Sequence, residues 1–331
     1  MTLQERIKLM VALGEYLLLD GEEWQHQRQI ASIKNPWFTE EFSKLASEQI
    51  ANNFLKEDLL NDWVKHYNLD DNIVPKKVGI VMAGNIPLVG FHDFLCVFIS
   101  GHRQSIKLSE KDAVLMTHIV HYLRNISQDF INYVNLAEQL KDCDAYIATG
   151  SNNTGVYFEK YFGKYPHIIR KNKTSVAVIS GDETPDELSK LSDDIHLYYG
   201  LGCRNVTKLM VPEGYDFVPM IDAFGRYQYF ADSQKYKNNF DYQLSLLLLN
   251  KQHYITNNVT LLSENTSPFS AISCLHYEYY KDENDLKNKI GAMENIQCMV
   301  GKKYLAFGQA QKPSLFDYAD GVDTMQFLLS L

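Results

Sequence analysis

The chain has 331 residues, of which 45% are hydrophobic and 22% are charged, so it is long enough to form two domains with sizeable cores. Its 32 basic and 41 acidic residues leave a net charge of −9, which argues against nucleic acid or an anionic membrane surface as the main partner. The N-terminus lacks a signal-peptide pattern and the apolar runs are too short to cross a bilayer. We therefore expect a cytoplasmic protein without membrane insertion.

Residues 1–72 are expected to form a helical N-terminal segment, because apolar residues recur every three or four positions with charges between them. Gly21 and Pro36 mark breaks between helices. From Lys76 onward, short β-branched runs alternate with helix-like segments. This alternation predicts an α/β protein with a mainly parallel sheet and helices on both faces.

The clearest expected strands lie in KKVGIV, SIK, DAYIAT, TSVAVI, VTKLMVP and VTLLSEN. TPDELSKLSDDIH predicts a helix with Pro185 in its first turn, and a Tyr- and Phe-rich helical region follows Phe217. No linker or internal repeat separates the parts. The expected division is the N-terminal segment, a first α/β domain at 73–196, a second at 197–300 and a C-terminal segment at 301–331.

The turn ATGSNNTG ends a strand and enters a helix. Gly150 and Gly155 permit a tight turn, and Ser151 and Thr154 at the helix N-terminus offer donors to a phosphate or a ribose. The glycine spacing differs from the dinucleotide fingerprint. Taken alone, this motif is better explained as a structural turn than as a cofactor site.

Two further motifs place polar side chains at strand ends. In IKLSEKD, Lys107 ends a strand while Ser109 and Glu110 start a helix, so the lysine is positioned for ribose hydroxyls or a 2′-phosphate. The alternative is a solvated lysine beside a helix cap. In AGNIP, the Asn85 amide is suited to donate to an oxyanion, although Asn-x-Pro is also a common turn sequence.

Cys203 stands in the turn GLGC, directly before the strand VTKLMVP. A thiol is the most nucleophilic side chain at neutral pH, and glycine neighbours let a substrate carbonyl approach closely. The alternative is a buried, inert cysteine. We assign that alternative to the other four, which are Cys96, Cys143, Cys274 and Cys298. The five cysteines form no Cys-x-x-Cys pair, so neither a disulfide framework nor a metal site is predicted.

The order and spacing of these motifs resemble the aldehyde dehydrogenase superfamily. Asn-x-Pro, Lys-x-Ser-Glu, Gly-Ser-x-x-x-Gly and Gly-x-x-Cys follow one another as the family's N-F/Y-P, K-P-S-E, G-S-x-x-x-G and G-Q-x-C do. In ENTSP, Glu264 precedes Pro268 as the glutamate does in the family's E-x-F-G-P segment. The small size and the ending FGQAQKPSLFDYADGVDTMQFL look most like the LuxC-type long-chain fatty acyl-CoA reductases.

The resemblance implies a Rossmann-type NAD(P)-binding domain at 73–196 and a smaller α/β catalytic domain at 197–300, with residues 301–331 returning to the cofactor domain. It makes Cys203 the nucleophile and gives its oxyanion hole to Asn85 and the Cys203 backbone N–H. The implied cofactor-binding residues are Lys107, Ser109, Glu110, Gly150, Ser151, Thr154, Gly155 and Glu264.

Departures from the family pattern favour one reaction over another. Hydrolytic members have an E-L-G-G glutamate as general base, but the corresponding stretch here is IIRKNKTSVAVI, with Arg170 and no glutamate. Without a base to activate water, an acyl-cysteine would persist until a thiol or hydride reaches it. Leu201 replaces the glutamine of G-Q-x-C, and Leu108 replaces the proline of K-P-S-E.

The resemblance therefore implies reduction of a long-chain acyl-CoA thioester to the aldehyde, with NADPH as cofactor and NADH as the alternative. The expected partners are acyl-CoA or an acyl-donor protein. A second copy of the chain, in a homodimer, is a further expected partner. Other readings are a different CoA-acylating dehydrogenase or an acyl-phosphate reductase on the same fold. A hypothesis from another functional class is that the chain is a catalytically silent family member and serves as a subunit.

Overall fold

The computed structural model describes residues 1–331 and divides into two compact units. The first unit comprises Met1–Asn172 and Pro313–Leu331, and the second comprises Lys173–Lys312. None of the helices combines the length and the hydrophobicity that a bilayer crossing demands.

Four helices open the first unit, as the apolar periodicity predicts. They are α1 (Leu3–Leu19), α2 (Glu22–Lys34), α3 (Glu40–Phe54) and α4 (Glu57–His66). α1 begins at a capping box between Thr2 and Glu5, and it ends where Asp20 adopts a left-handed conformation (φ 52°) just before Gly21. Apolar residues of these helices join the core that also covers the first sheet.

The first unit contains one five-stranded parallel sheet in the order β3-β2-β1-β4-β5. Its strands are β1 (Lys77–Val81), β2 (Arg103–Lys107), β3 (Val134–Leu136), β4 (Ala145–Thr149) and β5 (His167–Arg170). Its other helices are α5 (Phe91–Ile99), η1 (Glu110–Asp112), α6 (Ala113–Ile126), η2 (Gln128–Asn132), α7 (Asn152–Phe162), η5 (Ala319–Gly321) and α12 (Thr324–Leu329). α7 packs on β4 and β5. The chain order reverses between β1 and β4, as in a doubly wound nucleotide-binding sheet.

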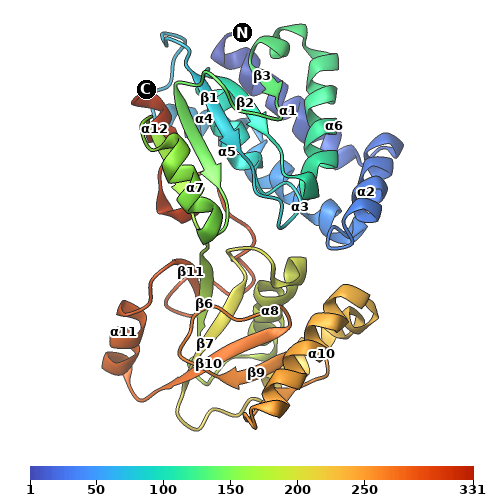
Figure 1. The fold of residues 1–331 in the computed structure, drawn as a ribbon, viewed down its shortest axis with the longest axis vertical. Coiled ribbons are helices and arrows are strands. Elements are labelled where there is room, and N and C mark those ends of the chain that lie inside the picture. The colour runs from blue at the N-terminus through green and yellow to red at the C-terminus, as the bar shows by residue number, and fades with distance from the viewer. The chain divides into compact units, whose positions relative to one another are not determined.

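The second unit contains a six-stranded sheet in the order β11-β6-β7-β10-β9-β8, parallel except for β8. Its strands are β6 (Thr174–Val178), β7 (Val206–Pro212), β8 (Ile255–Thr256), β9 (Leu261–Glu264), β10 (Cys274–Tyr280) and β11 (Ile296–Val300). Its helices are α8 (Pro185–His196), η3 (Leu197–Gly200), α9 (Val218–Ala223), η4 (Phe224–Asp232), α10 (Gln234–Leu249) and α11 (Glu283–Gly291). α8 packs on β7, α10 on β9 and α11 on β10 (Figure 1).

The expected boundary at 196/197 differs from the observed division at 172/173. β6 and α8 belong to the second unit because β6 pairs with β7 and α8 supplies Leu188, Leu191 and Ile195 to the core of that sheet. The chain returns to the first unit at Pro313 rather than near 301, since β11 pairs with β6 in the second unit.

Candidate functional site

Three loops of the first unit meet at the carboxyl edge of its sheet. The loop after β1 carries Asn85, the loop after β2 follows Lys107, and the loop after β4 carries Gly150 and Ser151. β1 pairs with both β2 and β4, so the three loops leave neighbouring strands at the same edge. The reversal of strand order between β1 and β4 is where open parallel sheets bind nucleotides.

The loop after β1 is held closely against the loop after β2. A Cβ at Gly84 would lie 2.5 Å from Ser109 Oγ, so only glycine fits this approach. Leu88 adopts a left-handed conformation (φ 58°), and its N–H donates to the Asp112 carboxyl at 2.8 Å. Burial raises the pKa of Asp112 well above its usual value. Asn85 lies in this loop with an exposed side chain.

The loop after β4 enters α7 through a capping box. Ser151 Oγ accepts from the Thr154 N–H at 3.3 Å, and Thr154 Oγ1 accepts from the Ser151 N–H at 3.1 Å. Both hydroxyls therefore serve the helix start, which is the structural explanation that the sequence also allowed. A Cβ at Gly150 would lie 2.9 Å from the Phe158 ring, and the buried Gly155 accommodates the Lys171 side chain.

The Lys-x-Ser-Glu motif, which the resemblance assigns to cofactor binding, carries two exposed charged side chains. Lys107 and Glu110 are exposed, and Ser109 Oγ caps η1 by accepting from the Lys111 N–H at 3.3 Å. A cationic side chain at the carboxyl end of β2, next to two close-packed loops, fits the phosphate or ribose of a dinucleotide. The fit rests on this edge geometry and on the exposure of Lys107.

Arg170 ends β5 and is committed to a structural ion pair. Its guanidinium contacts the Asp93 carboxylate in α5 and donates to Thr324 Oγ1 in α12 at 2.8 Å. The side chain is 3% exposed. A buried arginine in this role cannot accept a proton, so it does not replace the missing general base.

In the second unit, a strained turn leads to Cys203. Tyr198, Tyr199 and Gly200 are consecutive left-handed residues, with φ of 55°, 56° and 73°. Such a conformation costs a non-glycine residue about 1–3 kcal/mol. Both tyrosines are buried, and the Tyr199 ring packs on Phe230 at a centroid distance of 4.4 Å. Packing of the rings thus offsets the strain of the backbone immediately before the thiol.

Two buried polar side chains anchor the backbone of the cysteine turn. Asn205 Oδ1 accepts from the Gly202 N–H at 2.8 Å, and the Asn205 N–H donates to the Gly202 carbonyl at 3.0 Å. Ser175 Oγ donates to the Cys203 carbonyl at 3.0 Å. Three of the four backbone polar groups of Gly202 and Cys203 are held in this way. Asn205 Nδ2 also lies 2.9–3.2 Å from the carbonyls of Asp194, Ile195 and Leu197.

A buried carboxyl links α8 to the segment 308–310. The Asp194 carboxyl accepts from the N–H groups of Gly308 at 2.6 Å and Ala310 at 2.9 Å. Burial raises the pKa of Asp194 to about 7, and the two N–H donors oppose that rise. Arg204 Nη1 donates to the Ala310 carbonyl at 3.3 Å. The residue after Cys203 and the helix before it therefore hold the same segment.

The cysteines assigned as inert differ in their surroundings. Burial raises the pKa of the Cys96 and Cys143 thiols, and it raises that of Cys274 to about 11. These thiols are poor nucleophiles at neutral pH. Cys298 is half-buried, and its Sγ lies 3.1 Å from Ser175 Oγ, so it is a neighbour of the Cys203 turn.

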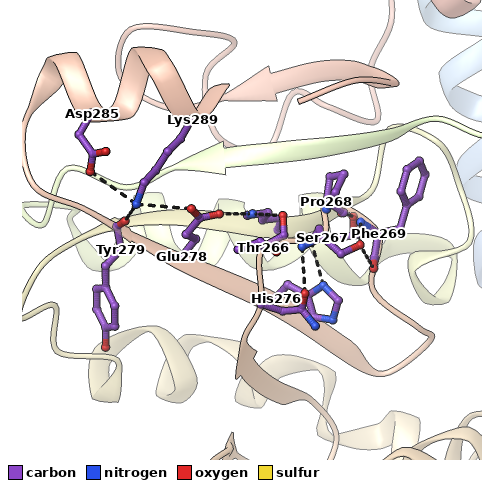
Figure 2. A network of polar contacts seen from close by, with 12 residues as sticks. Thr266, Ser267, Pro268, Phe269, His276, Glu278, Tyr279, Asp285 and Lys289 are labelled. Atoms are coloured by element: carbon purple, nitrogen blue, oxygen red, sulfur yellow. Dashed lines mark hydrogen bonds and ion pairs between the residues drawn. The ribbon is translucent and has the colours of Figure 1, made fainter. Parts of the chain in front are cut away.

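Glu264 is the last residue of β9, and its side chain is exposed. The connection from β9 to β10, residues 265–273, bends back across the sheet toward the start of β7. Thr207 Oγ1, four residues after Cys203, donates to the Pro268 carbonyl at 2.6 Å. The segment that carries Glu264 is thereby tied to the strand that follows Cys203 (Figure 2 shows the segment from Thr266 to Phe269).

The sequence-predicted residues thus fall into two groups. Asn85, Lys107 and Gly150 gather at the sheet edge of the first unit, while Cys203 and the segment after Glu264 gather in the second. The pairing of Asn85 with Cys203 stays a prediction. Sequence reasoning missed the anchoring side chains, which are Ser175, Asn205, Thr207 and Lys208. For Asn205, Thr207 and Lys208 the available signal was their position directly after Cys203, at the start of an otherwise apolar strand, whereas Ser175 carried no such signal.

Comparison with known proteins identifies the fold. No protein-family model matches the sequence, and no curated protein matches it. Many solved structures resemble it. Aldehyde dehydrogenase 21 from Physcomitrella patens, in complex with succinate, superposes with a TM-score of 0.68 at 11% identity over 91% of this chain and 74% of that one. An NAD-dependent aldehyde dehydrogenase from Sinorhizobium meliloti matches 100% of this chain and 73% of its own, with a TM-score of 0.63 and 12% identity.

A third similar structure carries ligands. It is a cysteine-to-alanine mutant of aldehyde dehydrogenase C from Pseudomonas syringae in complex with NAD+ and octanal. Its TM-score is 0.64 at 10% identity, over 87% of this chain and 70% of that one. The sequence identities are low, so these similarities are similarities of fold. The chain has the aldehyde dehydrogenase fold.

Proposed function

We propose that the protein reduces a long-chain acyl-CoA thioester to the aldehyde with NADPH, through a covalent intermediate on Cys203. The anchored Cys203 turn carries this proposal. Asn205 and Ser175 fix the peptides on both sides of the thiol, which is the preorganisation that a nucleophile and its oxyanion donor need. The similar solved structure in complex with NAD+ and octanal supports a nicotinamide cofactor and an aliphatic aldehyde as ligands on this fold.

The chain's own residues have defined tasks in this scheme. The Cys203 thiolate attacks the acyl carbonyl, and the Asn85 amide and the Cys203 N–H stabilise the oxyanion. The carbon–sulfur bond to CoA then breaks, and the CoA thiolate leaves and takes up a proton. A nicotinamide cofactor, when bound, would supply a hydride to the acyl carbon. Asn85 and the Cys203 N–H would stabilise the second oxyanion, and the break of its bond to Cys203 would release the aldehyde and restore the thiolate.

The missing general base favours thioester reduction over aldehyde oxidation. Between Glu159 and Asp182 the chain contains no carboxylate. Arg170, which stands in that stretch, is buried in its pair with Asp93. Slow hydrolysis of the acyl-cysteine leaves it available to hydride or to a thiol.

Mass spectrometry of the intact protein tests the proposal. Incubation with palmitoyl-CoA without cofactor is expected to add one palmitoyl group on Cys203, and NADPH should then remove it as the absorbance at 340 nm falls. Cys203→Ala should abolish both signals. Cys274→Ala is the matched control, because this thiol lies in the same unit with its pKa raised to about 11, and it should react like the wild type.

Three other results would contradict the proposal. Acylation by acetyl phosphate but not by palmitoyl-CoA would favour an acyl-phosphate reductase. Acylation by acetyl-CoA alone would favour a short-chain CoA-acylating dehydrogenase. Absence of any adduct with the folded protein would favour a catalytically silent subunit.

A further inference from the structure

Lys208 is a fully buried lysine in β7, five residues after Cys203, with 0% of its surface exposed. Its Nζ donates to the Thr266 carbonyl at 2.6 Å and to Glu278 Oε2 at 2.5 Å. An ammonium group removed from water costs several kcal/mol unless ion pairing and hydrogen bonds compensate. Replacement of such a pair by apolar residues is often neutral or stabilising, so fold stability alone gives little reason for a lysine here.

One of the two partners of Lys208, the Thr266 carbonyl, belongs to the segment that follows Glu264. The carbonyls of three consecutive residues there each accept a side-chain hydrogen bond. Lys208 bonds Thr266, His276 Nδ1 lies 3.0 Å from the Ser267 carbonyl, and Thr207 bonds Pro268. Figure 2 shows this segment beside His276 and Glu278.

A local irregularity of β7 lets the adjacent residues Thr207 and Lys208 both bond the segment after Glu264. Ser175 pairs with Val206, and the next residue of β6, Val176, pairs with Lys208. Thr207 is therefore an extra residue in the ladder, and such a bulge re-aims the neighbouring side chains. Thr207 and Lys208 consequently both reach the segment, where strict alternation would place them on opposite faces.

Glu278, whose carboxylate pairs with Lys208, is also held by a second lysine. Lys289 Nζ in α11 lies 3.4 Å from Glu278 Oε1 and 3.5 Å from Asp285, and it donates to the Tyr279 carbonyl. Glu278 therefore has a cation on each oxygen, one buried and one at the surface. Of these two lysines, Lys208 also donates a hydrogen bond to the segment after Glu264. Figure 2 shows Lys289 with its acidic partners.

We propose that Lys208 is a positioning residue that sets the place of the Glu264 carboxylate relative to the strand that follows Cys203. The inference rests on the proposed function and on the family resemblance, which makes Glu264 a cofactor-binding residue. Lys208 does not touch the reacting atoms. It fixes the backbone two residues beyond Glu264, and a displacement of about 1 Å at such a site can cost roughly 100-fold in rate.

The decisive comparison uses a double variant, because Lys208→Met alone leaves Glu278 with one cation and can destabilise the protein. Lys208→Met/Glu278→Leu removes the buried pair entirely, so its urea midpoint is expected to stay near the wild-type value. Its kcat with palmitoyl-CoA and NADPH is expected to fall about 10- to 100-fold, while the KM for palmitoyl-CoA stays unchanged.

Lys289→Met is the matched control. It takes the other lysine away from the same carboxylate but keeps both bonds of Lys208, to Glu278 and to the Thr266 carbonyl. This variant is expected to retain the kcat of the wild type. Equal kcat values for Lys208→Met/Glu278→Leu, Lys289→Met and the wild type would overturn the inference while leaving the proposed function intact.

A cofactor-independent readout separates the two proposals. Hydrogen–deuterium exchange of the backbone amides of residues 265–267 and 269 is expected to be roughly tenfold faster in Lys208→Met/Glu278→Leu than in the wild type, the effect of one lost hydrogen bond. Wild-type exchange rates there would overturn the inference whatever the activity. A wild-type protein that reduces no acyl-CoA would instead overturn the proposed function.

Discussion

The two units present their site residues in different ways. In the first unit Asn85 and Ser151 are exposed residues on loops whose backbones are held, and Lys107 is the exposed last residue of β2. In the second unit the backbone around Cys203 is fixed by side chains that are themselves buried, such as Ser175 and Asn205, both 0% exposed. The first arrangement suits recognition of a polar cofactor by loops on a rigid sheet. The second suits chemistry, where atoms need fixed positions.

The largest expected effect is a loss of unfolding free energy, which we compare for one side-chain truncation in each unit. Asn205→Ala leaves the Gly202 N–H and three carbonyls without this partner, and each buried unsatisfied group costs about 1–3 kcal/mol. We expect the free energy of unfolding of the second unit to fall by about 3–5 kcal/mol. Ser151→Ala removes only a helix cap and should cost about 1 kcal/mol. Urea denaturation measures both, and equal losses would erase the contrast between the units.

The next effect is a pH dependence of stability in the second unit. The native pKa of Asp194 is raised to about 7 from its ordinary value of 3.8, so the folded state binds more protons than the unfolded state between these values. The contribution of Asp194 to stability is therefore complete at low pH and is lost as the pH rises from about 4 to 7, by at most about 1.4 kcal/mol per pH unit.

Urea melts at pH 5, 6 and 7 check this slope. Asp194→Asn should remove it. Asp193→Asn, whose carboxylate is half-buried and paired with Arg226 at 3.0 Å, should keep it. A wild-type slope that survives in Asp194→Asn would show that the two N–H donors from 308–310 keep the carboxylate ionised across this range.

The smallest effect concerns one hydroxyl that supports the cysteine turn. Ser175→Ala removes the donor to the Cys203 carbonyl and the acceptor of the Cys298 N–H, and we expect kcat to fall about tenfold with a stability loss of about 1–3 kcal/mol. Thr174→Val is the control, because its hydroxyl is equally buried in the same strand but bonds Thr207 and Asn205 rather than Cys203. Equal kcat values for the two variants would mean that the turn needs no support from β6.

The sequence predicted the helical start, the parallel sheets and the strand-end loops, since these follow from local periodicity and turn chemistry. It did not predict β10 or β11, because CLHYEYY and IQCMV mix polar and apolar residues that find their places only against β7 and β6. The motif residues were visible because they are loop residues with unusual chemistry. Ser175, Asn205 and Lys208 were not, because their roles depend on backbone groups that are distant in sequence.

The ion pair of Arg170 bears on the order in which the chain folds during synthesis. Arg170 bonds Asp93, 77 residues before it, and Thr324, 154 residues after it. The second unit is continuous in sequence, whereas the first takes its last helix from the end of the chain. A ribosome-bound chain can therefore complete the second unit while the first still lacks α12. The unit that carries Cys203 can thus assemble before the first unit receives its last helix.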